Sequence, residues 1–122
     1  MLSHWVKKFQ NAFRGIFYGA VGETSFYFHV AAAVAVVVAA WLLNCSSEQW
    51  CILLLCIAIV MSLELINSSV EHLAKGLCEE QNPHVGKALD IASGAVLIAS
   101  IFAAIIAAII FIPQLLALWG TT

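Results

Sequence analysis

Three long apolar stretches limit what this chain can fold into. They cover residues 26–43, 50–66 and 91–118, and Glu64 is the one Asp, Glu, Lys or Arg within them. An α-helix needs about 20 apolar residues to cross the hydrocarbon core of a bilayer. A composition with 63% hydrophobic and 10% charged residues also lies outside the usual range of soluble domains. The sequence therefore predicts an all-α membrane protein with three transmembrane helices.

The segment before the first span, residues 1–22, has the pattern of an amphipathic helix. Its aromatic residues recur one turn apart, at Trp5, Phe9, Phe13 and Phe17, and the basic and polar residues lie mostly elsewhere on the helix. This pattern is typical of a helix that lies in the interface between lipid and water. Two interpretations are open: a plain membrane anchor, or a cover for a site where lipid and water-soluble reactants meet.

The basic residues predict the orientation of the chain. Lys and Arg occur before the first span and between the second and third spans, whereas the loop 44–49 has none. Because basic residues concentrate in cytoplasmic loops, we expect a cytoplasmic N-terminus, an outer C-terminus, and a cytoplasmic helix extension and loop over residues 67–90. The whole chain, 1–122, is expected to form one integral-membrane domain. Five scattered basic side chains argue against a nucleic-acid partner.

Local signals indicate where the helices end. The second helix is expected to continue to Gly76, because neither Pro nor another Gly interrupts it. Asp90 is a candidate N-cap of the third membrane helix. Pro113 is expected to end or kink that helix, since proline has no backbone N–H donor. A disulfide between Cys45 and Cys51 is conceivable, and the cysteines form no redox or zinc motif.

The far end of the second span carries the most informative residues. Glu64, Asn67, Ser68 and Glu71 are spaced i, i+3, i+4 and i+7 and therefore share one face of a helix. A carboxylate inside a bilayer costs about 3 kcal/mol or more, and it usually faces protein or a water-filled cavity. A polar packing seam between helices is the structural alternative. Two acids on one face favour a functional site.

Two carboxylates at different depths can divide the chemical work. Glu64, the deeper acid, is suited to take a proton, and Glu71 is suited to stay ionised and hold a cation. Mg²⁺ is usually bound by one or two carboxylates together with phosphate oxygens. Glu23 or Asp90 could complete such a site. The two lysines of the cytoplasmic segment could contact phosphate or serve only as markers of topology.

The stretch ELINSSVE, which contains these residues, resembles the motif E-x-x-N-[ST]-x-x-E of the small prokaryotic lipid kinases, the diacylglycerol kinase and undecaprenol kinase family. Asp90 follows the last Glu of the motif by nineteen residues, and the resemblance extends over nearly the whole chain. It implies a homotrimer in the bacterial plasma (inner) membrane, with active sites shared between subunits. Such an enzyme transfers the γ-phosphoryl group of ATP, with Mg²⁺, to the hydroxyl of a membrane lipid.

The resemblance also implies roles for individual residues. Glu64 matches the catalytic base, and Glu23 and Glu71 match the Mg²⁺-binding acids, which also contact ATP. The other expected contacts of ATP are Asn67, Lys87 and Asp90. The expected contacts of the lipid substrate, besides Glu64, are Phe13, Arg14, His29 and Ser93.

Two positions depart from the family pattern. The Lys that usually precedes the aspartate and contacts phosphate is Leu89 here, and the Asp usually found four residues after the motif is Lys75. Lys87 or Lys75 could substitute for the missing cation. A catalytically impaired kinase homologue therefore stays an open alternative, as does a non-enzymatic membrane protein with an acidic cation path. His29 and the ending IIFIPQL favour undecaprenol slightly over diacylglycerol as the substrate.

Overall fold

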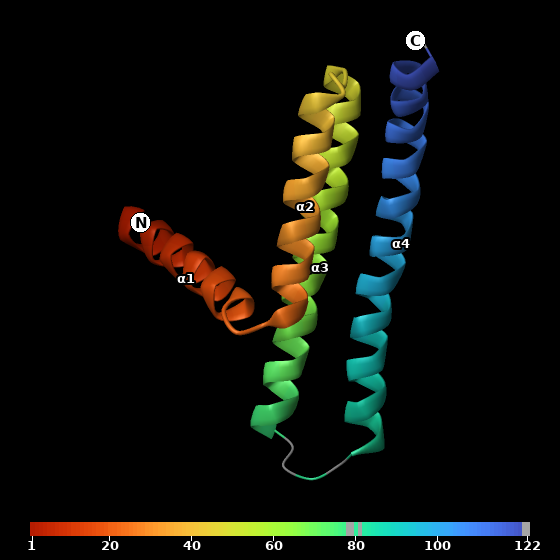
Figure 1. Ribbon diagram of the computed structural model, residues 1–122. Helices are drawn as coiled ribbons and strands as arrows, with labels where there is room; N and C mark the ends of the chain where they lie inside the picture. Colours follow the sequence, from red (N-terminus) through yellow and green to blue (C-terminus); the bar gives the residue numbers. More distant parts are fainter. Residues whose placement is uncertain (78–79, 81, 121–122) are drawn as a thin grey trace.

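The computed structural model describes residues 1–77, 80 and 82–120, and all regular structure in them is helical. The helices are α1 (Leu2–Ala20), α2 (Thr24–Leu42), α3 (Ser47–Leu77) and α4 (Pro83–Gly120) (Figure 1). By length and apolar composition, α2, α3 and α4 can each cross a membrane. The predicted class, an all-α membrane protein with three membrane helices after an N-terminal helix, is confirmed.

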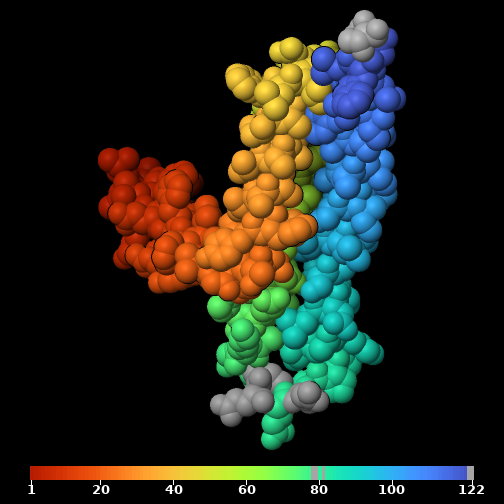
Figure 2. Space-filling view, in the orientation of Figure 1, coloured from red at the N-terminus to blue at the C-terminus, as the bar shows by residue number. Residues whose placement is uncertain are grey.

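The helix α3 is the centre of the bundle, because both α2 and α4 pack against it. Its contact with α4 is the most extensive, its contact with α2 is next, and α2 touches α4 little. Neighbouring helices run in opposite directions, and the lower ends of α3 and α4 extend beyond the start of α2 (Figures 1 and 2). The helix α1 points away from the bundle at an angle, and none of its residues is buried.

The apolar core is small. Ala40, Leu53 and Ile110 form one buried cluster near the turn between α2 and α3, and most large apolar side chains are exposed in the single chain. Lipid tails are as apolar as these side chains, so the hydrophobic effect does not drive membrane helices together. Close packing of small residues and polar contacts between helices therefore have to hold the bundle.

The helix ends differ from the predictions at two points. The structure begins α4 at Pro83, after Asn82, whose Oδ1 accepts from His84 N at 2.9 Å. Proline suits the first position of a helix because that backbone N–H would lack a partner anyway. Asp90 is therefore well inside α4, and its predicted role as N-cap is wrong. The helix also continues past Pro113 to Gly120, so an end at the proline is wrong too.

The turn between α2 and α3 is held by local hydrogen bonds. Asn44 takes up a left-handed backbone conformation, with φ 55°, which asparagine tolerates. Ser46 and Gln49 then cap α3 reciprocally: Ser46 Oγ accepts from Gln49 N at 3.2 Å, and Gln49 Oε1 accepts from Ser46 N at 2.9 Å.

The conceivable disulfide between Cys45 and Cys51 is not formed, since both cysteines are free. Burial raises the pKa of the Cys45 thiol, and its Sγ–H donates to Gln114 Oε1 at 3.3 Å. The predicted helix extension of α3 is present and ends at Leu77, one residue beyond Gly76. Positions 78, 79 and 81 of the predicted cytoplasmic loop lie outside the described residues.

Candidate active site

Three polar side chains of α3 are buried in the bundle. Glu64 is 4% exposed, Asn67 is 8% exposed and Ser68 is 2% exposed. A buried polar group is costly unless it has a hydrogen-bond or ion-pair partner. Glu64 and Asn67 each have such a partner, whereas Ser68 Oγ has no hydrogen-bond partner among the described residues.

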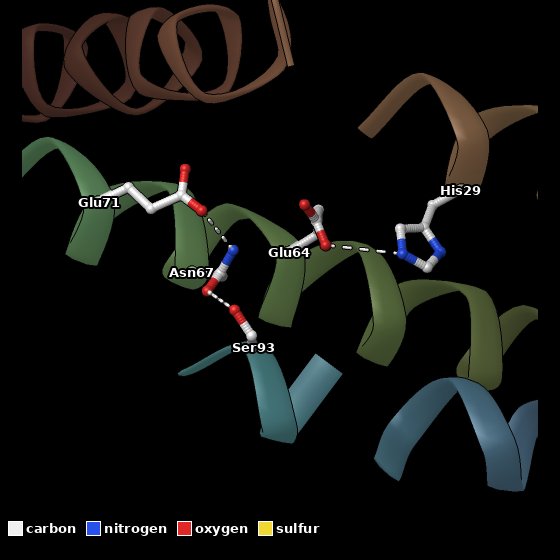
Figure 3. A network of polar contacts seen from close by, with 5 residues as sticks. All are labelled: His29, Glu64, Asn67, Glu71 and Ser93. Atoms are coloured by element: carbon white, nitrogen blue, oxygen red, sulfur yellow. Dashed lines mark hydrogen bonds and ion pairs between the residues drawn. The ribbon is translucent and has the colours of Figure 1, made fainter. Parts of the chain in front are cut away.

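Glu64 is paired with a histidine from α2. His29 Nε2 lies 3.5 Å from Glu64 Oε2, and the two side chains are 14% and 5% exposed (Figure 3). His29 lies one turn into α2, at the level where this helix crosses the polar part of α3. A protonated imidazole at this distance attracts the carboxylate and fixes its orientation.

Asn67 connects α4 to the second acid of the motif. Its Oδ1 accepts from Ser93 Oγ at 3.4 Å, and its Nδ2 donates to Glu71 Oε1 at 3.1 Å (Figure 3). The amide thus uses both ends, one to hold α4 and the other to orient the Glu71 carboxylate. The second oxygen of that carboxylate is left available for another partner.

A groove of about 500 Å³ runs along these side chains. The acids and Asn67 line it from α3, Thr24, Ser25 and Phe28 line it with His29 from α2, and Ser93 and Leu97 are among its lining residues from α4. Because its walls come from three different helices, the groove depends on how the bundle is packed. Glu64, Asn67 and Glu71 all line this groove, which makes it the candidate active site.

Charges of both signs act on Glu64. The charges of Glu23 and Glu71 both act on Glu64 and repel its negative charge, whereas His29 attracts it. Glu23 is the half-buried N-cap residue of α2, and its side chain makes no capping hydrogen bond. Two carboxylates that each act on Glu64 favour a cation near it.

The acidic residues near the groove suit Mg²⁺ better than they suit a metal ion whose ligands all come from the protein. No group of three or more His, Cys, Asp or Glu side chains that could hold a metal occurs in residues 1–77, 80 and 82–120. Mg²⁺ is usually bound by one or two carboxylates plus phosphate oxygens and water. Glu71, oriented by Asn67, and Glu23, whose carboxylate is not used in capping, offer the oxygen donors that such a site requires.

Ser68 does not join the other motif residues in the groove. It lines a different pocket, of about 480 Å³, between α3 and α1, together with Gly19 and Leu65. Ser68 follows Asn67 by one residue, a rotation of about 100° around the helix, and this is enough to turn it toward α1. A Cβ atom added to Gly19 would lie 2.6 Å from the Leu65 side chain, so glycine permits this close approach.

The single chain does not bring every predicted site residue to the groove. Phe13 and Arg14 are exposed on α1, and Lys87 and Asp90 are exposed on α4. None of these four side chains lines the groove. Leu89, which precedes Asp90, is half-buried and lies one helical turn before Ser93. Glu23 does not line the groove either. The predicted roles of all the site residues stay predictions.

Sequence reasoning missed several residues of the groove. Thr24, Ser25 and Phe28 line it from α2, and Ser100 lines it from α4. The helical period offered a signal for two of them: Ser25 lies one turn before His29, and Ser100 lies two turns after Ser93. The apolar character of the surrounding sequence hid this signal.

Comparison with known proteins identifies the family. Residues 10–111 match the family described as prokaryotic diacylglycerol kinase. The undecaprenol kinase of Bacillus subtilis (strain 168) is 38% identical over 114 residues, which cover 93% of each chain. The diacylglycerol kinase of Synechocystis sp. (strain ATCC 27184 / PCC 6803 / Kazusa) is 34% identical over 111 residues, 90% of this chain and 63% of that protein. The chain therefore belongs to the prokaryotic diacylglycerol kinase family and is a lipid kinase.

Proposed function

We propose that the protein phosphorylates the hydroxyl of a membrane lipid, using ATP and Mg²⁺, at the cytoplasmic face of the bacterial plasma membrane. The observation that carries this proposal is the buried Glu64, held by His29 in a groove that it shares with Asn67 and Glu71. A lipid kinase needs a proton acceptor at the depth of a lipid hydroxyl and an anionic site for a metal nucleotide. The groove offers both.

Glu64 is the proposed base. It would accept the proton of the lipid hydroxyl while the hydroxyl oxygen attacks the γ-phosphorus and ADP leaves. The pairing with His29 keeps the carboxylate at one position, and its 5% exposed side chain excludes most water from the acceptor. Exclusion of water favours transfer to the lipid over transfer to water.

The nucleotide would lie on the side of Asn67 and Glu71. Bound Mg²⁺ would supply charge neutralisation for the phosphates, and Glu71 and Glu23 would hold it. Asn67 orients Glu71 through its Nδ2, as the 3.1 Å hydrogen bond indicates. Lys87 and Asp90 lie one to two turns before Ser93 on α4, on the approach to the groove from the cytoplasmic segment.

A homotrimer would complete the site. Phe13, Arg14, Lys87 and Asp90 are exposed in the single chain, and a second copy packed against the groove could offer the missing lipid and nucleotide contacts. The many small residues of α2 and α4 permit close approach between helices of neighbouring copies. With the N-terminus cytoplasmic and the C-terminus outside, the groove would face the cytoplasmic half of the membrane.

Undecaprenol is the first lipid to test and diacylglycerol the second. The relative at 38% identity is named an undecaprenol kinase and the one at 34% a diacylglycerol kinase. His29, one of the features that favoured undecaprenol, lies directly beside the proposed base. In its predicted contact with the lipid, it would lie next to the reacting hydroxyl.

The test is transfer of labelled phosphate from ATP to lipid by the reconstituted protein, with each lipid in turn and with Mg²⁺ present or chelated. We expect transfer that requires Mg²⁺, and a loss of about 100-fold or more in Glu64→Gln, since a general base contributes about 10²- to 10⁴-fold. Normal transfer by a correctly assembled Glu64→Gln variant would exclude Glu64 as the base. Absence of transfer to either lipid by the wild type would overturn the proposed function.

A further inference from the structure

The pocket between α1 and α3 has a volume of about 480 Å³ and shares no lining residue with the groove. Its lining residues are Gly15, Tyr18 and Gly19 on α1 and Leu65, Ser68, Ser69 and His72 on α3. The helices touch at Gly19, where an added Cβ atom would lie 2.6 Å from Leu65, whereas a Cβ atom added to Gly15 would meet nothing within 4 Å. The helices therefore diverge from Gly19 towards the start of α1, and the pocket is the wedge between them.

The wall that α3 gives to this pocket changes from apolar to polar along the helix. Leu65 lies at one end, Ser68 and Ser69 follow, and His72 lies nearest the end of α3. The seven residues from Leu65 to His72 correspond to a rise of about 10 Å. In the predicted orientation, Leu65 is the deepest of them in the membrane and His72 is the closest to the cytoplasm. The polarity of the wall thus follows that of a phospholipid, from its acyl esters to its phosphate.

A buried hydroxyl in this pocket lacks a partner. Ser68 is 2% exposed, and its Oγ has no hydrogen-bond partner among the described residues. Buried polar side chains nearly always have one, so an acceptor from outside the chain fits here. Tyr18, Ser69 and His72 add a phenol, a hydroxyl and an imidazole N–H that can donate. The pocket therefore suits a ligand that is rich in acceptor oxygens.

The charges around the pocket favour an anion. The helix α1 contains Lys and Arg but neither Asp nor Glu. On α3, Lys75 follows His72 by three residues and Ser68 by seven, so these three side chains share one face of the helix. Lys75 is exposed and its long side chain can extend towards the pocket. The neighbouring acid, Glu71, lines the groove instead, where it accepts from Asn67 Nδ2.

We propose that the pocket between α1 and α3 binds the phosphate group of an anionic membrane phospholipid. The phosphate oxygens would accept from Ser68 and His72, Lys75 would supply the positive charge, and the acyl esters would lie beside Leu65. Such a lipid would fill the wedge and hold α1 against α3. A soluble phosphate offers the same oxygens, but the apolar end of the pocket favours a lipid. The inference does not rest on the proposed function, because this pocket is separate from the groove.

The first test compares two photoreactive lipids that differ only in the headgroup. The full-length protein in phosphatidylcholine vesicles is irradiated with phosphatidylglycerol or phosphatidylcholine that carries the same diazirine at the ester end of one acyl chain. We expect phosphatidylglycerol to label residues 15–19 and 65–72 about fivefold more strongly, the effect of one lysine near an anionic headgroup. Equal labelling by the two probes would overturn the proposal. Labelling by neither, as expected if a second copy of the chain fills the wedge, would overturn it too.

Inorganic phosphate separates a lipid headgroup from a soluble phosphate. It is added to the same vesicles in excess over the probe, with the ionic strength held constant so that general screening does not change. We expect the labelling by phosphatidylglycerol to stay unchanged, because inorganic phosphate has no apolar part to contact Leu65. Loss of the labelling would assign the pocket to a soluble phosphate and would overturn the assignment to a lipid.

Lys75→Gln tests the charge of the site in the same assay. We expect it to remove most of the fivefold difference between the two probes. The matched control is Lys7→Gln, which removes one positive charge from α1. Lys7 lies eight residues before Gly15, a rise of about 12 Å, which exceeds the Debye length of about 8 Å at physiological salt. Equal losses in the two variants would show only a general attraction to anionic lipid and would overturn the site.

Ser68→Ala tests the hydroxyl. The substitution removes a buried group that has no partner in the described part of the chain, so the protein should fold and assemble as the wild type does. We expect labelling of residues 15–19 by phosphatidylglycerol to fall about tenfold, the size of one hydrogen bond to a charged group. Full labelling in Ser68→Ala and in Lys75→Gln would show that the lipid lies elsewhere and would overturn the proposal.

Discussion

Polar side chains meet between helices at both ends of the bundle, but they do so in different ways. At the end beside the turn between α2 and α3, called the outer end after its predicted orientation, Gln114 Nε2 donates to Gln49 Oε1 at 3.0 Å, and the Cys45 thiol donates to Gln114. At the other end, Glu64 and Glu71 line an open groove beside His29. The groups at the outer end are neutral and satisfy one another, whereas Glu71 and Glu64 repel each other.

This difference separates polar residues that hold helices together from polar residues that do chemistry. Hydrogen bonds between neutral side chains stabilise membrane helices at little cost. Carboxylates that repel one another are expensive there and are kept where a function requires them. Changes at the outer end should therefore alter stability, and changes in the groove should alter turnover.

The largest effect is expected from Glu71→Gln. The substitution keeps the size of the side chain but removes the charge that would hold Mg²⁺, so we expect kcat/KM for ATP to fall about 100-fold or more. Thermal stability should not fall, because a repulsion with Glu64 is also removed. The measurement is phosphate transfer at several Mg²⁺ concentrations, together with a thermal unfolding curve.

The control for this prediction is Glu48→Gln. Glu48 is exposed in the first turn of the same helix, at the outer end, and its substitution should change turnover by no more than about twofold. Equal losses of activity in the two variants would show that the charge of α3 as a whole, and not the groove, is what matters.

His29→Gln should have a smaller effect on the same reaction. The amide can still form a hydrogen bond to Glu64, but it cannot carry the positive charge that attracts and orients the carboxylate at 3.5 Å. We expect kcat for lipid phosphorylation to fall about tenfold, as for residues that orient a catalytic group. The KM for ATP should stay constant, since His29 lies on the lipid side of the groove.

A fall in the affinity for ATP with unchanged kcat would contradict this role of His29. The test also bears on the substrate, because wild type and variant can be compared with undecaprenol and diacylglycerol in parallel. A preference for undecaprenol that disappears in His29→Gln would identify the histidine as a determinant of lipid choice.

Gln114→Leu should alter stability and leave chemistry unchanged. The substitution removes two hydrogen bonds between the outer end of α4 and its neighbours. We expect the free energy of unfolding to fall by about 1 kcal/mol, the usual size of such bonds between membrane helices. Unfolding in mixed detergent micelles measures it, and kcat/KM at a permissive temperature should stay within about twofold of wild type.

If Gln114→Leu reduced turnover as strongly as His29→Gln at a temperature where both are folded, the contrast between the two ends of the bundle would be lost. Gln49→Leu provides a second variant of the same network. Besides the bond to Gln114, it removes the hydrogen bond that Gln49 Oε1 accepts from Ser46 N, which is stronger than the thiol bond lost in Gln114→Leu. Its loss of stability should therefore exceed that of Gln114→Leu.

The sequence predicted the membrane class, the approximate spans and the group Glu64, Asn67 and Glu71, because apolar length and helical period act within one helix. It could not predict the partners of these residues, His29 and Ser93, as specific contacts, since they come from other helices. The N-cap role predicted for Asp90 was wrong for a related reason. Asn82 and Pro83 form a stronger helix start, and the apolar span at 91–118 gives no sign that its helix begins before the span does.

The resemblance to the prokaryotic lipid kinases, stated from the motif, is confirmed by the family match. The motif alone placed Ser68 beside Asn67 on one face, and the structure separates them. The four motif residues span an arc of about 100° around the helix, and α1, which approaches closely at Gly19, packs against the edge that carries Ser68. Gly22, with φ 85°, lies in the turn between α1 and α2.

The smallest effect, and the one that best tests the departure from the family pattern, is expected from Leu89→Lys. Leu89 is half-buried, one helical turn before Ser93 on α4, so a lysine there could extend its amine along the helix toward the phosphates while its stem stays packed. We expect the KM for ATP to fall about threefold, the size of a modest charge interaction at an accessible site.

Lys87→Ala should raise the KM for ATP if Lys87 supplies the positive charge that contacts phosphate. The double variant Leu89→Lys, Lys87→Ala should then have a KM close to that of wild type. A Leu89→Lys protein with unchanged KM, in which Lys87→Ala is also silent, would show that the nucleotide obtains its positive charge from neither position of α4.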